Sequence, residues 1–113
     1  MPRPRSKILA LNCFVLGETL NNIFRVQIND VEIVGTLKEF IKKKKKHTLQ
    51  HVDADTLMLW KVSMPYSALN APPELPAGEP LFPVKMLSEI FPNHQVGESI
   101  DVIIKPPQPP PGK

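Results

Sequence analysis

Proline is the residue that most limits what this sequence can fold into. Fourteen of the 113 residues are proline, about 12% against a usual ~5%, and most lie in residues 65–92 and 106–111. Proline has no amide hydrogen and its ring clashes inside a helix, so neither segment can form a long regular element. The pattern excludes a coiled coil. It predicts a long, stiff loop over residues 63–83 and an extended tail over residues 106–113.

The rest of the sequence has the size and charge of one ordinary domain. Each independent core needs roughly 50 or more residues, so we expect a single core. The net charge is +3, and five positive charges form one run, which disfavours a uniformly basic nucleic-acid-binding protein. No apolar run reaches the ~18 residues of a membrane span. We expect a basic arm over residues 1–7, a domain over residues 8–105 and a proline-rich tail over residues 106–113.

Four segments have the composition of β-strands. Residues 8–15 are apolar and β-branched, and turn residues separate them from residues 24–28, where every second side chain is apolar. This pair predicts an antiparallel hairpin with one buried face. Residues 56–62 are apolar on both faces, which is typical of a central strand, and residues 99–104 form the last predicted strand.

The N-terminus has a second interpretation. Basic residues 2–7 followed by apolar residues 8–16 also resemble the start of a secretory signal. Asn12 interrupts the apolar stretch, however, and no small-x-small cleavage site follows it. We therefore interpret residues 8–15 as the first strand.

A helix is predicted over residues 35–44. Thr36 and Glu39 fit a capping box, whose side chains would satisfy free amides at the helix start. An apolar stripe at helical spacing follows, formed by Leu37, Phe40 and Ile41. A short second helical turn over residues 86–91 is ended by Pro92.

The predicted order is therefore two strands, a helix, a strand, a loop, a short helix and a strand. A crossover helix packed on one face of a sheet, with the last strand inserted into that sheet, is an economical arrangement. We predict an α+β fold: a ubiquitin-like β-grasp roll with a mixed ββαββ-type sheet, one main helix and a short second helix.

Five segments, in this order, resemble the N-terminal domain of crinkler effectors from oomycete and fungal plant-associated microbes. They are CFVLGE (13–18), FRVQI (24–28), VGTLKEFIK (34–42), DTLMLWKVS (55–63) and DVIIKPP (101–107). The last resembles the His-Val-Leu-Val-x-x-Pro sequence that closes this domain in the family, with Asp101 in place of the histidine. Residues 57–62 resemble the fungal variant of the oomycete Leu-x-Leu-Phe-Leu-Ala-Lys delivery motif.

The resemblance implies a ubiquitin-like module associated with secretion and delivery into a host cell. In the family, this module precedes a variable toxic or signalling domain that acts in the host nucleus. The sequence has no such domain after Lys113, so we expect the N-terminal module alone.

The lysine run is a candidate nuclear-import signal. It consists of Lys42, Lys43, Lys44, Lys45 and Lys46. Consecutive residues turn by about 100° on a helix, so the run cannot all face solvent on one helix, and we expect the helix to fray within it. A solvated helix end and contacts to phosphates are the alternatives.

The sequence offers little catalytic chemistry. His47 and His51 have the i, i+4 spacing of zinc ligands, with Asp53 and Asp55 nearby, but polar loop histidines explain them better. Cys13 lies in an apolar strand and is interpreted as a small buried hydrophobe. We predict neither an enzyme nor a cofactor.

A partner-binding face is predicted around Trp60. Met58, Trp60 and Val62 share one face of the third strand, while Leu57 and Leu59 would face the helix. Large aromatic side chains on a helix-free sheet face suit protein contacts. The alternative is that the proline-rich loop folds over this face and buries it.

We predict a non-catalytic N-terminal module of a secreted crinkler-type effector, working in the host cell, and in its nucleus, through contacts with a host or microbial protein or an import receptor. The alternatives are an intracellular ubiquitin-like adaptor and a nuclear or nucleic-acid-associated protein that uses residues 42–46. Steep salt dependence would identify phosphate binding.

Overall fold

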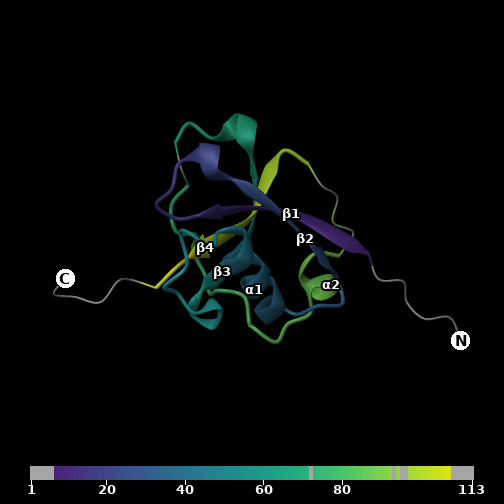
Figure 1. Ribbon diagram of the computed structural model, residues 1–113. Helices are drawn as coiled ribbons and strands as arrows, with labels where there is room; N and C mark the ends of the chain where they lie inside the picture. Colours follow the sequence, from purple (N-terminus) through teal and green to yellow (C-terminus); the bar gives the residue numbers. More distant parts are fainter. Residues whose placement is uncertain (1–6, 72, 93, 95–96, 108–113) are drawn as a thin grey trace, which may run out of the picture.

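A four-stranded mixed sheet forms the centre of the molecule. The computed structural model describes residues 7–71, 73–92, 94 and 97–107 (Figure 1), so the predicted basic arm before residue 7 and the tail after residue 107 lie outside the described residues. The strands are β1 (Ile8–Val15), β2 (Phe24–Asn29), β3 (Met58–Pro65) and β4 (Ser99–Lys105), in the order β2-β1-β4-β3. β1 runs parallel to β4, and the other two pairs are antiparallel.

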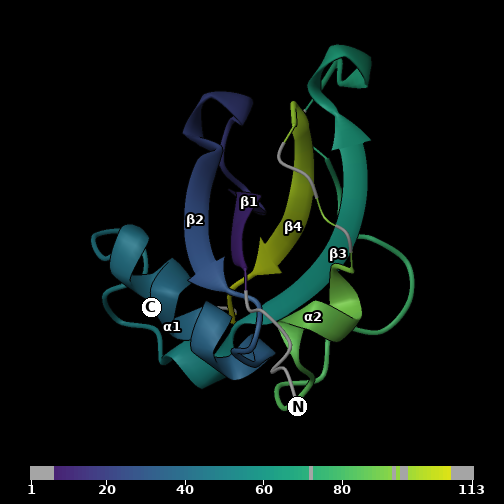
Figure 2. The same cartoon turned by 90° about the vertical axis from the view of Figure 1, so that its right-hand side faces the viewer.

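Two helices complete the described part of the fold. They are α1 (Val34–Lys44) and the short α2 (Leu87–Ile90), and Figure 2 shows both gathered at one end of the sheet. Short 3-10 turns η1 (Leu20–Asn22) and η3 (Tyr66–Ala68) lie at the opposite end, and η2 (Ala54–Thr56) precedes β3. The predicted α+β, β-grasp-like architecture is therefore confirmed. The three 3-10 turns were not predicted.

The main core lies between the sheet and α1. Leu37 and Ile41 of the predicted stripe are fully buried, and Phe40 is half-buried at the edge of this core. Leu57 and Leu59 join the same core, so the prediction that they face the helix is confirmed. The apolar positions of α1, which recur every 3.6 residues, and those of the strands, which recur every two residues, therefore face the same core.

A second core cluster lies outside this main core. Phe14, Ile100 and Ile103 form its buried centre. Partly buried side chains pack around them, contributed by the turns at the η1 and η3 end of the sheet and by the end of β3: Leu16, Leu20, Ile23, Val62, Met64, Tyr66 and Leu69.

The start of α1 differs from the prediction. The helix begins at Val34, and the capping residue Ile33 makes no side-chain hydrogen bond, so the capping-box prediction is wrong. The amides of Val34 and Gly35 instead donate to the carbonyls of Lys85 and Pro83, at 2.9 and 2.8 Å. The backbone that leads into α2 therefore satisfies the free amides of the first turn.

β3 lies at the edge of the sheet, so the prediction of a central strand over residues 56–62 is wrong. The proline-rich loop packs against this edge. The amide of Leu81 donates to the carbonyl of Leu59 at 2.7 Å, on an edge that β4 does not cover. β3 starts at Met58, later than predicted, because Thr56 belongs to η2. It extends to Pro65, past a register shift between Lys61 and Met64. Across the described residues, none of the helices has the length and apolar character needed to cross a membrane.

Candidate functional site

The face predicted around Trp60 is largely covered. Trp60 is only 6% exposed, and its Nε1 donates a hydrogen bond to the carbonyl of Gly78 at 3.2 Å. Val62 is half-buried against the second core cluster, and Met58 alone of the three stays exposed, at 45%. The prediction of an exposed indole on a contact face is therefore wrong, and the alternative, in which the loop covers it, is correct.

The lysine run lies where α1 ends. The helix stops at Lys44, and Lys45 has left the helical conformation, so the predicted fraying within the run is confirmed. Lys43, Lys44 and Lys46 are exposed and Lys42 is half-buried. The lysines also lie at the negative end of the helix dipole, which favours positive charge there.

Lys45 differs from the other lysines because its side chain is held by the fold. Its Nζ lies 3.0 Å from Oε1 of Glu18 and 5.4 Å from the centre of the Phe24 ring. This ion pair and cation–π contact tie the end of α1 to the β1–β2 connection. The run therefore divides into one structural lysine and four that remain accessible to solvent.

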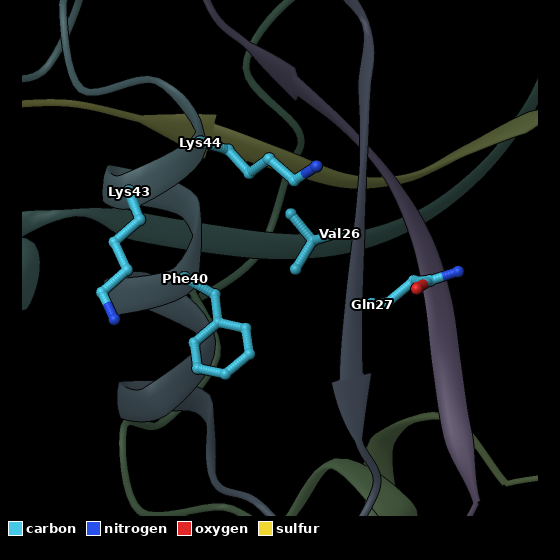
Figure 3. Close-up of a pocket in the computed structure, with 5 residues that line it drawn as sticks. All are labelled: Val26, Gln27, Phe40, Lys43 and Lys44. Carbon is cyan, nitrogen blue, oxygen red and sulfur yellow. The ribbon is translucent and has the colours of Figure 1, made fainter.

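A groove lies between α1 and β2. Figure 3 shows Phe40 and Lys44 reaching from α1 toward Val26, while Lys43 lies farther out on the helix. The hollow has a volume of about 270 Å³, and Gln27 completes its lining. Its floor is apolar, since it is formed by the side chain of Val26, which is buried, and the ring of Phe40, which is half-buried.

The groove continues around the edge of the sheet. Arg25, Gln27 and Lys44 line an adjoining hollow, so Lys44 borders both. Arg25 and Gln27 are exposed on the opposite face of β2 from Val26. We call the combined surface the basic groove, formed by Arg25, Val26, Gln27, Phe40, Lys43 and Lys44. It combines an apolar floor with positive charge on both sides of one strand.

A buried polar cluster joins β1 to β4. The carboxylate of Asp101 accepts a hydrogen bond from the backbone amide of Asn12 at 2.9 Å. The side-chain oxygen of Asn12 accepts one from Nε of Arg25, also at 2.9 Å. Asn12 and Asp101 are 2% and 9% exposed. Burial raises the pKa of Asp101, although the Asn12 amide, His94 and Arg25 oppose this.

His94 closes the polar cluster on its other side. Its Nε2 lies 3.0 Å from the carbonyl of Ala10 and 3.7 Å from Oδ2 of Asp101. A carbonyl only accepts, so Nε2 must carry a hydrogen in this contact. The cluster was not predicted, although Asn12 and Asp101 each interrupt an apolar strand in the sequence.

Lys38 is another buried charged residue that the sequence did not indicate. It is 6% exposed and lines a hollow of about 240 Å³ near the start of α1, together with Asp55 and Pro83. Burial lowers the pKa of its ammonium group, while the nearby Asp55 carboxylate raises it.

The candidate metal residues do not converge. His47 and His51 are exposed in a turn, and His51 lies against Gln50 with 3.2 Å between their Nε2 atoms. Within the described ranges, no three His, Cys, Asp or Glu side chains are grouped as a metal site would require. Cys13 is fully buried, as predicted, and burial raises the pKa of its thiol.

Comparison with known proteins supports the sequence resemblance. Residues 9–105 match the Crinkler effector protein N-terminal domain. Crinkler effector protein 1 of Rhizophagus irregularis is 33% identical over 102 residues, which cover 88% of this chain and 22% of the relative. The chain thus spans about a fifth of that relative's length. The chain belongs to the crinkler effector N-terminal domain family.

Proposed function

We propose that this domain is the N-terminal module of a crinkler-type effector, that it takes part in delivery into a host cell, and that it acts there through protein contacts without catalysis. The observation that carries the proposal is the match over residues 9–105, almost the whole described fold. The curated relative is much longer than this chain, which fits a module that precedes a separate effector domain.

The fold supports a contact role in two ways. Lys38 and Asp101, two of the buried groups with shifted pKa values, do not line the hollows of the basic groove. The basic groove is an accessible surface with mixed chemistry, where positive side chains surround an apolar floor. Such a combination suits recognition of another polypeptide.

Delivery can be tested with a reporter fused after residue 107. A plant-associated microbe would secrete the fusion, and the reporter signal would be read inside plant cells. We expect signal with the domain and none with the reporter alone. A destabilised variant such as Leu37→Ala, which loses a fully buried side chain, serves as the control for folding.

Retention of the folded fusion inside the microbe would contradict the delivery role. It would favour an intracellular adaptor that uses the same surfaces. Secretion without entry into plant cells would separate export from delivery, and it would also contradict the proposal.

A second candidate role, nuclear import in the host, has its own supporting observation. Lys43, Lys44 and Lys46 are exposed beyond or at the last turn of α1, where an import receptor can reach them. Under this proposal the delivered domain is carried into the host nucleus by the lysine run.

A further inference from the structure

β2 is an edge strand with an open backbone. It pairs with β1, and the sheet order places no described strand on its other side. In an edge strand, alternate backbone N–H and C=O groups point away from the sheet, and they form a template for an added strand. Peptide recognition by strand addition uses this feature.

The groove beside β2 has room for a side chain. The hollow between α1 and β2 has a volume of about 270 Å³. Its walls are the Phe40 ring and the Val26 side chain, which Figure 3 shows facing one another across the hollow. An extended chain lying along β2 would direct every second side chain into this space.

Positive charge follows both faces of the β2 edge. Lys44 reaches from α1 toward β2, Lys43 lines the hollow farther out on the helix, and Arg25 lies on the other face of the strand. Lysines near an edge can also serve to prevent aggregation by repelling other strands. Preventing aggregation does not require an aromatic-walled hollow beside the strand. The lysines also would not repel a strand that carries negative charge.

We infer that the basic groove binds an extended acidic segment of a partner protein, which adds to β2 as a further strand. The segment places an apolar side chain between Phe40 and Val26, and its acidic side chains lie beside Lys43, Lys44 and Arg25. The inference rests on the proposed role of this domain in protein contacts, and it names the chemistry of the partner.

The test uses the isotope-labelled domain and NMR titration with short acetylated peptides. The probe is a peptide in which valine and isoleucine alternate with aspartate and glutamate, and its control has lysine at every acidic position. We expect the acidic peptide to shift the amides of β2 and the last turn of α1. The lysine peptide should leave them unchanged, and added salt should weaken binding of the acidic peptide.

A matched pair of variants locates the site. Lys44→Glu reverses a charge that borders both hollows, and Lys85→Glu reverses an exposed charge next to the opposite end of α1. We expect Lys44→Glu to weaken peptide binding about fivefold or more and Lys85→Glu to change it less than about twofold. Unchanged melting temperatures would show that both variants are folded.

Three results would overturn the inference. One is the absence of shifts with the acidic peptide, another is equal weakening by both variants, and the third is a DNA duplex that shifts the same amides when the peptide does not. The reporter assay keeps the two proposals apart. Delivery without peptide binding would reject the acidic-segment inference alone, whereas peptide binding without delivery would reject the delivery role and retain the groove.

Discussion

The carboxylate of Asp101 accepts a hydrogen bond from the backbone amide of Asn12, at 2.9 Å, close to the point where β1 and β4 stop pairing. The parallel ladder joins Cys13 to Val102 and continues toward the ends of both strands. Before Cys13, side chains replace the ladder, and the Asn12 side-chain amide donates to the carbonyls of Gly97 and Ser99, both at 2.9 Å. A polar cluster therefore holds the two central strands together.

Removing the Asp101 carboxylate should destabilise the sheet. Asp101→Ala leaves the buried Asn12 amide without its acceptor, and we expect a loss of about 1–3 kcal/mol in the free energy of unfolding. Asp101→Asn keeps an acceptor oxygen and should lose less. Urea unfolding of the three proteins at one pH measures both effects, and an Asp101→Ala protein as stable as the natural sequence would contradict this role.

The raised pKa of Asp101 predicts a pH effect of definite sign. Because burial raises this pKa above the ordinary 3.8, the native state binds the proton more tightly than the unfolded chain. The resulting stabilisation is present below about pH 3.8 and is lost as the pH rises through the native pKa. The stability of the natural sequence relative to Asp101→Asn should therefore increase on acidification from neutral pH.

The comparison is sharper when the histidine beside Asp101 is removed. His94 and Arg25 both face Asp101 and lower its pKa. Measuring urea unfolding in a His94→Gln background removes the contribution of the histidine. A relative stability that falls on acidification in this background would show that burial does not dominate at Asp101.

Trp60 should behave as a core residue. Trp60→Ala removes a side chain that is 6% exposed, and we expect it to cost about 3–5 kcal/mol of stability. Trp60→Phe keeps much of the apolar surface but loses the hydrogen bond to Gly78, which corresponds to about 1 kcal/mol. Thermal or urea unfolding orders the two variants. An Ala variant that binds partners poorly but unfolds normally would assign Trp60 to a contact surface.

Phe40 and Leu37 should differ, although they belong to one stripe. Leu37→Ala empties a fully buried position and should cost about 2–5 kcal/mol. Phe40→Ala shortens a half-buried side chain at the wall of the basic groove, so we expect only about 1–2 kcal/mol. Equal losses, measured by urea unfolding, would indicate that the Phe40 ring lies deeper than the structure places it.

The elements were predictable because their patterns are local. The alternation in residues 24–28 and the stripe through Leu37 and Ile41 each define one buried face without reference to the rest of the chain. The start of α1 was not, since its amides bond to carbonyls of Pro83 and Lys85 far along the sequence. A local capping motif carries no signal for such a long-range partner.

The candidate site was only partly predictable for the same reason. The lysine run is visible in the sequence, but the special place of Lys45 depends on Glu18 and Phe24, which are brought together by the fold. The basic groove exists because β2 lies at the edge of the sheet. The alternation of apolar residues within β2 does not indicate which strands are its neighbours. The proline-rich loop has no periodic sequence pattern from which its path over Trp60 could be predicted.

Nuclear import through the lysine run predicts a variant that spares the fold. Replacing Lys42, Lys43, Lys44 and Lys46 with glutamine removes the accessible charges and keeps the Lys45 pair with Glu18. A fusion to a reporter too large for free diffusion should accumulate in plant nuclei with the natural sequence and lose that accumulation with the four glutamines. Lys45→Gln alone should lower the melting temperature and leave the nuclear fraction unchanged. If the four-glutamine fusion stays nuclear, the lysine run is a solvated helix end and not an import signal.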